Sequence, residues 1–98
     1  MLNEGQKDFK RVQIVRYMIT RLYDALYLIH DRKFIEAIPA CLELCLIAKQ
    51  HIDKQLVFHT HFLLGKLFAS LSYNTHARTV FDFIRDMAEE TMNNSQSM

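Results

Sequence analysis

The chain of 98 residues contains two cysteines and five histidines, the residue types that most often hold a metal ion. Cys41 and Cys45 are four residues apart, a spacing that shares a helix face but matches neither a usual zinc knuckle nor the geometry of a disulfide. His59 and His61 are two apart, so their side chains point about 200° apart around a helix and do not share a metal. We therefore expect no metal, and we expect both cysteines to be buried free thiols in a reducing compartment such as the cytoplasm.

Paired carboxylates are the second arrangement that could do chemistry. Asp82 with Asp86 and Glu89 with Glu90 fall on what should be the outer face of the last helix, where solvated acidic residues are ordinary. The sequence has no glycine-rich phosphate loop, no Gly-x-Ser-x-Gly and no His-Glu-x-x-His. We therefore expect neither enzymatic activity nor a cofactor.

Composition indicates one small helical domain over residues 1–98. Half of the residues are hydrophobic and 23% are charged, while there are only two glycines and one proline, so long helices are favoured over short strands. No apolar run approaches the roughly 20 residues that cross a bilayer, so we expect no membrane span. The net charge of +1 is divided unevenly, at +3 over residues 1–33 and −2 over residues 34–98.

Apolar residues recur every three or four positions in four stretches, which predicts helices over residues 6–30, 34–49, 54–71 and 75–92. The first helix is long unless it breaks near Arg16. Pro39 is expected in the first turn of the second helix, with a start at residue 35 or later, or else at a kink. We expect Asp53 to cap the third helix, Asn74 or Thr75 to cap the fourth, and residues 93–98 to fray. One stripe runs along the first helix: Phe9, Val12, Val15, Ile19, Leu22, Leu26 and Ile29.

The two halves of the chain match at an offset of 40 residues. Large positions match large ones and small positions match small ones in these pairs: Met18 and Phe58, Leu22 and Phe62, Ala25 and Gly65, Leu28 and Phe68, Ala37 and Ala77, Cys41 and Phe81, Leu44 and Ile84, Ala48 and Ala88. Such a period, with two helices in each copy, indicates stacked helical hairpins. We expect Gly65 to face Ala77 where the helices cross, with Phe81 filling the space beside them.

The pattern resembles the tetratricopeptide repeat. The second copy carries the resemblance best, in Leu64, Gly65, Phe68, Ala77, Phe81 and Ile84, and the first copy carries it in Ala25, Leu28, Phe34, Ala37, Cys41 and Leu44. The resemblance implies a short α-solenoid with repeats at 18–49 and 58–91, and a groove lined by the first helix of each repeat. The chain departs from the family at its tryptophan site (Arg21, His61), its turn glycine (Arg32, Ser72) and its closing proline (Lys49, Glu89), and its period exceeds the usual 34. A four-helix bundle with halves alike by chance is the alternative.

The expected function is binding of a partner protein, as a scaffold or adaptor that holds a helix or peptide, or as part of a larger assembly. The candidate contact residues are Tyr17, Arg21, Asp24, Phe58, His61 and Lys66. The expected structural core of the repeats is Ala25, Ala37, Cys41, Gly65, Phe68, Ala77 and Phe81. Several large apolar residues exceed what the chain can bury and should meet a partner, another copy or a further part of a longer chain: Tyr17, Tyr23, Tyr27, Phe58, Tyr73 and Phe83.

Two other functions remain open. A nucleic-acid-binding regulator would use the basic first helix, with Lys7, Lys10 and Arg11 on phosphates, although three basic residues beside Asp8 are a thin footprint. A self-associating helical bundle would use the exposed apolar residues between copies. Binding to nucleic acid would weaken steeply with salt, and self-association would make the melting temperature depend on concentration.

Overall fold

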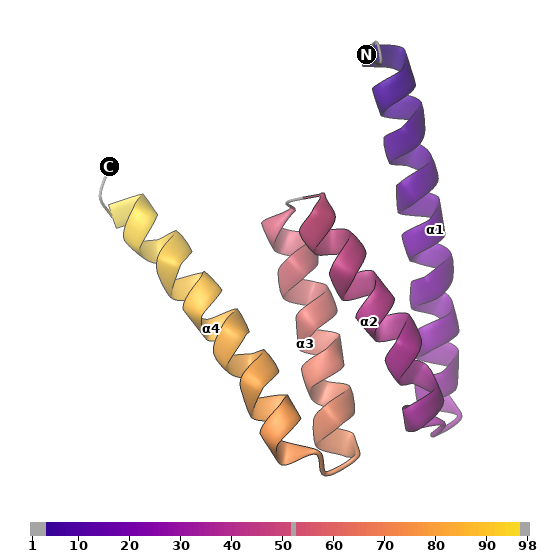
Figure 1. The fold of residues 1–98 in the computed structure, drawn as a ribbon, viewed down its shortest axis with the longest axis vertical. Helices are drawn as coiled ribbons and strands as arrows, with labels where there is room; N and C mark the ends of the chain where they lie inside the picture. The colour runs from indigo at the N-terminus through magenta and orange to yellow at the C-terminus, as the bar shows by residue number, and fades with distance from the viewer. Residues whose placement is uncertain (1–3, 52, 97–98) are drawn as a thin grey trace.

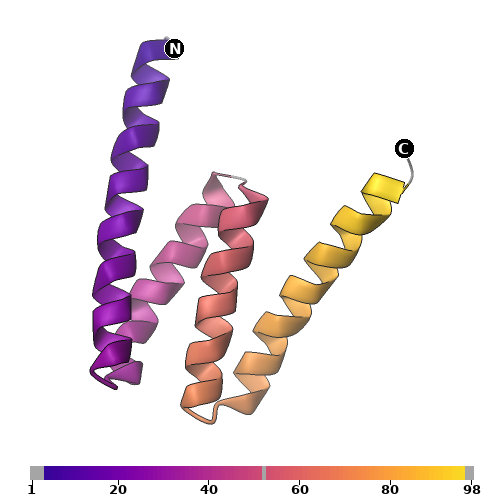
Figure 2. The ribbon, with the colours of Figure 1, turned by 180° about the vertical axis from the view of Figure 1, so that it is seen from behind.

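The chain folds into four consecutive helices, seen in a computed structural model that describes residues 4–51 and 53–96 (Figure 1). These are α1 (Glu4–His30), α2 (Phe34–Gln50), α3 (Lys54–Ser70) and α4 (Asn74–Gln96). Each helix packs against the next, which gives a slab of 45 × 37 × 18 Å. From behind, α1 and α3 lie in front, with α2 between and beyond them (Figure 2). The predicted all-α fold of helical hairpins is confirmed.

The turns that follow α1 and α3 close in the same way. Arg32 and Ser72, which are 40 positions apart, both adopt the left-handed backbone conformation, with φ of 61° and 63°. In each turn the next residue's amide donates to the carbonyl five positions back, at 2.8 Å in the first turn and 2.9 Å in the second. These are the bonds of a Schellman motif, in which glycine is the least strained residue. Arg32 and Ser72 stand where the tetratricopeptide repeat has a turn glycine. Both therefore adopt the backbone conformation that glycine favours.

The starts of α3 and α2 are as predicted, whereas the place of Pro39 within α2 is not. The Asp53 carboxylate accepts a hydrogen bond from the Leu56 amide at 3.1 Å, so the predicted cap is confirmed. The α2 helix begins at Phe34, as the predicted range of 34–49 has it, whereas the later start that would place Pro39 in the first turn is wrong, because Pro39 lies beyond that turn. Proline there removes one helical hydrogen bond, to the carbonyl of Ile35. Ile35 and Pro39 are both exposed, where water can solvate that carbonyl.

The predicted bounds of α4 need correction at both ends. The helix begins at Asn74, and the Ala77 amide donates to the Tyr73 carbonyl at 2.9 Å. A cap at Asn74 would have started the helix one residue later, and a cap at Thr75 two residues later. At the other end, the helix continues to Gln96 rather than stopping near residue 92. Of the tail that was expected to fray, residues 97–98 lie outside the described part of the chain.

Small side chains allow α1, α2 and α3 to approach one another closely. One buried cluster draws on all three helices and consists of Ala25, Ala37, Ala40, Cys41, Cys45, Leu64 and Leu67. A second, nearer the α2–α3 loop, consists of Met18, Leu44, Ala48 and Val57. Most of the α2 contributions are alanine or cysteine. Close packing of the backbones therefore replaces the bulky core that larger side chains would form.

Gly65 of α3 lies close to Phe81 of α4. A Cβ atom placed on Gly65 would lie 2.7 Å from Cε1 and 2.8 Å from Cζ of Phe81, distances that real Cβ atoms do not tolerate. Phe81 was expected to fill the space beside Gly65, and the three nearest atoms belong to its ring. Glycine is therefore needed here to accommodate an aromatic ring. At the equivalent positions of the first copy, Ala25 and Cys41 share one buried cluster.

The predicted stripe on α1 is the surface that packing leaves open. Met18 and Ala25 form the face that α2 buries. Five residues of the stripe, which we call the α1 stripe, are 37–48% exposed and run along the adjoining face: Val12, Val15, Ile19, Leu22 and Leu26. The helix thus has two neighbouring apolar faces. The small residue Ala25 lies on the packed one and the larger aliphatic residues lie on the open one.

Candidate protein-binding groove

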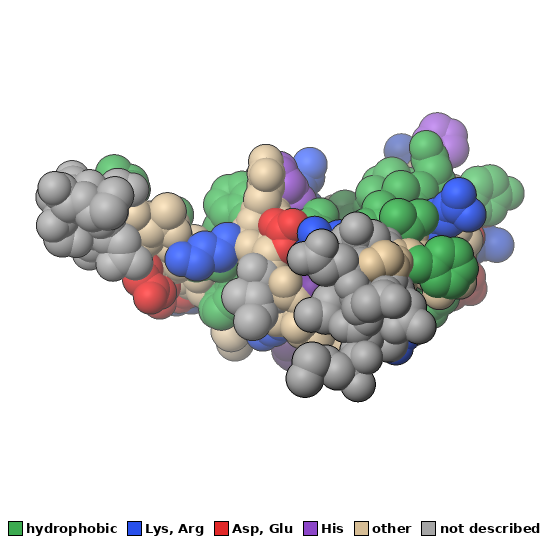
Figure 3. Space-filling model, turned by 90° about the horizontal axis from the view of Figure 1, so that it is seen from above, with side chains coloured by type: hydrophobic (Ala, Val, Ile, Leu, Met, Phe, Trp, Pro, Cys, Tyr) green, Lys and Arg blue, Asp and Glu red, His purple; other side chains and the backbone are tan. Residues whose placement is uncertain are grey.

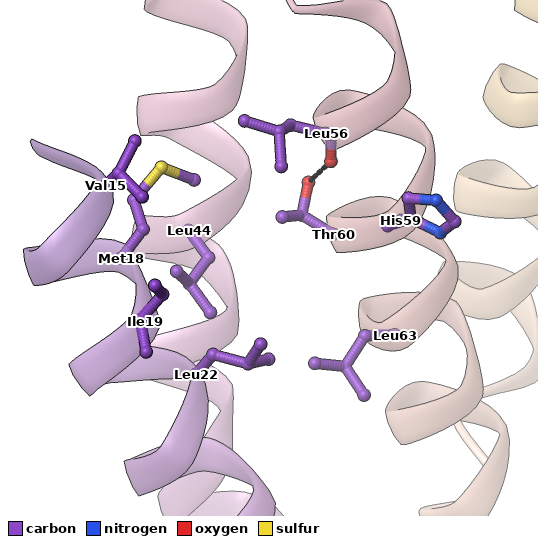
Figure 4. Close-up of a pocket in the computed structure, with 9 residues that line it drawn as sticks. All are labelled: Val15, Met18, Ile19, Leu22, Leu44, Leu56, His59, Thr60 and Leu63. Atoms are coloured by element: carbon purple, nitrogen blue, oxygen red, sulfur yellow. Dashed lines mark hydrogen bonds between the residues drawn. The ribbon is translucent and has the colours of Figure 1, made fainter. Parts of the chain in front are cut away.

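A groove of about 160 Å³ lies between α1 and α3, with α2 as its floor (Figure 4). Val15, Met18, Ile19 and Leu22 line it from α1, Leu44 from α2, and Leu56, His59, Thr60 and Leu63 from α3. Leu22 and Leu63 point toward one another across it (Figure 4). The lining is aliphatic on both sides, so the groove suits apolar side chains rather than a charged ligand.

The polar side chains of the lining have little to offer a ligand. The Thr60 hydroxyl donates its proton to the Leu56 carbonyl at 2.8 Å. The imidazole of His59 points away from α1 (Figure 4). Neither residue is placed to activate a nucleophile or to pair with a second titratable group in the groove. The lining that faces across the groove is therefore mainly aliphatic.

Apolar surface extends beyond the groove along α1. Hydrophobic side chains gather at the end of the molecule formed by this helix (Figure 3). The α1 stripe continues past the groove to Val12 at one end and Leu26 at the other, and Tyr23 and Tyr27 beside it are 69% and 71% exposed. Contiguous apolar surface of this kind marks interaction sites in soluble proteins. The prediction that Tyr17, Tyr23, Tyr27, Tyr73 and Phe83 remain exposed is confirmed, whereas Phe58 is half-buried.

Three of the predicted contact residues form a polar network with Glu43 of α2, away from the groove. Arg21 Nε donates to Glu43 Oε2 at 3.0 Å, and Arg21 Nη1 lies 3.4 Å from Asp24 Oδ2. The Tyr17 hydroxyl donates to Glu43 Oε1. This bond and the arginine lower the pKa of Glu43, and the same bond raises the pKa of Tyr17. The network joins α1 to α2, so its groups are largely engaged within the chain.

Phe58 and Lys66 lie on α3, outside the groove lining. Phe58 stacks on Phe62 with ring centroids 6.3 Å apart. The Lys66 ammonium lies 5.6 Å from the centre of the Phe62 ring, a cation–π contact. Phe62 is 45% exposed, so this aromatic group adds a second apolar surface on α3. The predicted contact residues therefore divide among separate places and do not form one site.

His61, one of the predicted contact residues, is buried. It is only 6% exposed, its Nδ1–H donates to the Val57 carbonyl at 2.8 Å, and its ring lies 4.9 Å from that of Phe83. A partner has almost no access to such a side chain. His61 and Phe83 occupy the positions equivalent to Arg21 and Glu43, at the offset of 40. The first hairpin thus uses an ion pair where the second uses two rings.

The burial of His61 predicts a stability that declines in acid. Burial, with a smaller effect of Lys49, lowers the His61 pKa below its ordinary value of 6.5. As the pH falls through that value the unfolded chain takes up a proton that the folded chain resists, so the free energy of unfolding decreases; above it both states are neutral and this effect is absent. Urea unfolding between pH 7.5 and 5 should show the decline. The decline should be smaller in His61→Gln, because glutamine keeps a donor for the Val57 carbonyl but does not titrate.

The exposed His59 provides the control for this measurement. His59→Gln, which leaves His61 in place, is expected to retain the decline. An equal slope in His61→Gln and the unmodified chain would contradict the assignment of the decline to His61.

The two cysteines are inert in this environment. Both are buried free thiols on α2. Burial, with a smaller effect of Cys45, raises the pKa of Cys41 to about 11, and burial also raises the pKa of Cys45. Since the thiolate is the reactive and metal-binding form, neither sulfur is primed for chemistry near neutral pH.

None of the predicted contact residues lines the groove. The resemblance to the tetratricopeptide repeat implied Arg21, Asp24 and His61 as contacts, and these lie on other faces of α1 and α3. The α1 stripe was visible in the sequence as a repeat of large aliphatic residues. A signal for its exposure was also present, since a neighbouring face carries the small residue Ala25, which is 0% exposed. Small residues mark the face where a helix approaches closely, which leaves the other face for a partner.

Beyond the groove, the described residues offer few other kinds of site. Among them, no three His, Cys, Asp or Glu side chains come together to hold a metal ion. None of the helices in residues 4–51 and 53–96 combines the length and apolarity needed to span a bilayer. Comparison of the chain with protein-family models, with curated proteins and with solved structures finds no match.

Proposed function

We propose that the chain is a tetratricopeptide-like protein-interaction module, without catalytic activity, that holds an apolar segment of a partner protein between α1 and α3. The observation that carries the proposal is the aliphatic groove together with the α1 stripe beside it. Large aliphatic side chains that remain 37–48% exposed have a free energy cost in water, which a partner removes by covering them.

The agreement between the two hairpins supports the resemblance. The turns after α1 and α3 share their hydrogen bonds and their left-handed residues, and α2 and α4 begin 40 positions apart. In stacked hairpins of this kind, the first helices of successive repeats line a concave face. The groove lies on this face, since α1 and α3 are the first helices of the two hairpins.

The outer face of α2 is the competing surface. Its exposed apolar residues, which we call the α2 outer stripe, are Ile35, Leu42 and Leu46. They lie outside the groove, and none of them lines either of two further hollows beside the N-terminal half of α1. Because hot spots of binding energy favour pockets from which water is excluded, the groove is the better candidate.

Selection from a displayed library of amphipathic helical peptides of about 14 residues, a length of about 21 Å, tests the proposal. Peptides that bind the unmodified chain should bind Ile19→Asp at least about tenfold more weakly, because complex formation would bury an unpaired carboxylate. Fluorescence anisotropy of the labelled peptides measures the change.

Leu46→Asp is the matched control, since it adds the same charge to an exposed aliphatic position of the α2 outer stripe. It should change affinity by less than about twofold. Circular dichroism establishes that both variants are folded. Binding that survives Ile19→Asp, or that both variants weaken equally, would place the interaction elsewhere.

A further inference from the structure

The apolar groove continues into a second, more polar hollow. This hollow, of about 850 Å³, lies beside the α2–α3 loop and shares Val15, Met18 and Leu56 with the groove. The two therefore form one channel along α1. Its aliphatic part lies beside Ile19 and Leu22, and its polar part lies beside the N-terminal half of the helix.

The polar end of the channel is basic. Lys10 and Arg11 of α1 line it together with Lys54 at the start of α3. Asp53 is the single acidic residue of the lining, and its carboxylate accepts the Leu56 amide at 3.1 Å. Among the described side chains, none of the three cations takes part in an ion pair. A ligand that follows the channel thus meets aliphatic surface and then a lining with three cations and one carboxylate, which is positive on balance.

An extended peptide is poorly suited to the aliphatic part of the channel. Its backbone amides and carbonyls would lie against aliphatic side chains, where Thr60 already donates its hydroxyl and His59 points away. Unpaired backbone groups in such a place lower affinity substantially. A helix pairs its own backbone groups and presents only side chains, as in other complexes in which a helix binds a groove.

A second copy of this chain is also a poor occupant. An acidic surface lies on α4, where Asp82 and Asp86 flank Arg85. The Arg85 Nη2 atom lies 3.6 Å from Asp82 Oδ1 and 3.7 Å from Asp86 Oδ1. Among the described side chains of α4, the exposed large apolar residues are Phe83 and Met92, at 39% and 61%. They are nine positions apart and so lie on opposite faces of the helix, which leaves no continuous apolar stripe beside the carboxylates. The complementary segment must combine an apolar stripe with acidic residues at one end.

We infer that the channel takes an amphipathic helix of another protein, with acidic side chains at the end that lies beside Lys10, Arg11 and Lys54. This inference rests on the proposed function and adds an orientation and a charge pattern to it. Aliphatic residues of the partner cover the α1 stripe. The carboxylates fix the direction of the helix and accelerate its association.

The peptides selected above test the inference. Binders should carry an excess of Asp and Glu at one end, and their affinity should fall as salt is raised, because exposed ion pairs are screened. The double variant Lys10→Glu, Lys54→Glu should bind them about tenfold more weakly. Arg78→Glu, Arg85→Glu changes the net charge equally on α4 and should alter affinity by less than about twofold.

The outcomes separate this inference from the proposed function. Ile19-dependent binders without an acidic end, or with unchanged affinity for the Lys10 and Lys54 variant, overturn the inference and leave the proposed function standing. The absence of any Ile19-dependent binder overturns both. A dimer in sedimentation that Ile19→Asp dissociates, or an oligo-dT strand that competes with the peptides, would identify a different occupant and overturn the inference.

Discussion

Replacement of Cys41 by phenylalanine is expected to lower the free energy of unfolding by about 3 kcal/mol, the upper part of the range for an overpacked core. Cys41 and Ala25 are both 0% exposed and belong to one buried cluster, so no space exists for a ring. The additional change Ala25→Gly should restore at least about 1 kcal/mol, although glycine alone weakens a helix by about that amount. Urea unfolding of the two single variants and the double variant measures the interaction.

The second hairpin supplies the reason to expect this rescue. There the equivalent positions hold Phe81 against Gly65, where a Cβ atom would lie 2.7 Å from the ring. The double variant therefore transfers a combination that the chain already accommodates 40 residues away. Leu46→Phe, on the exposed outer face of α2, is the control and should change stability by less than about 0.5 kcal/mol. Additive effects of Cys41→Phe and Ala25→Gly would show that the two hairpins do not pack equivalently.

Most of the fold follows from local patterns in the sequence. The spacing of apolar residues gave four helices, and Asp53 marked the start of α3, because helical periodicity and capping depend on near neighbours. The error at Pro39 arises because tertiary packing overrides local preference. The helix continues through a proline where the lost hydrogen bond faces water and the opposite face is buried.

The site was less predictable because exposure depends on which helices meet. Apolar spacing alone does not tell whether the α1 stripe or the face with Met18 and Ala25 packs on α2. Burial of His61 depends likewise on Phe83, which comes from another helix. What a single sequence does contain is a small apolar residue, Ala25, on one face of the helix, and here that residue marks the packed face.

Leu44 connects the core to the groove. It is 2% exposed, belongs to the buried cluster with Met18 and Val57, and its side chain also lines the floor of the groove. The groove therefore has a floor that the folded core holds in place. A ligand that binds there meets a preformed surface, which reduces the entropy lost on association.

Truncation of Leu44 to alanine should consequently lower the free energy of unfolding by about 3 kcal/mol, through lost burial and the cavity that remains. For a domain of this size the loss corresponds to a fall in melting temperature of about 12–24 °C. Leu42→Ala makes the same chemical change two residues away, at a side chain that is 49% exposed, and should lower stability by less than about 1 kcal/mol. Thermal and urea unfolding of the pair compare the two faces of α2 directly. Equal losses would mean that α2 does not present Leu44 to the core, and the groove above it would then lack its floor.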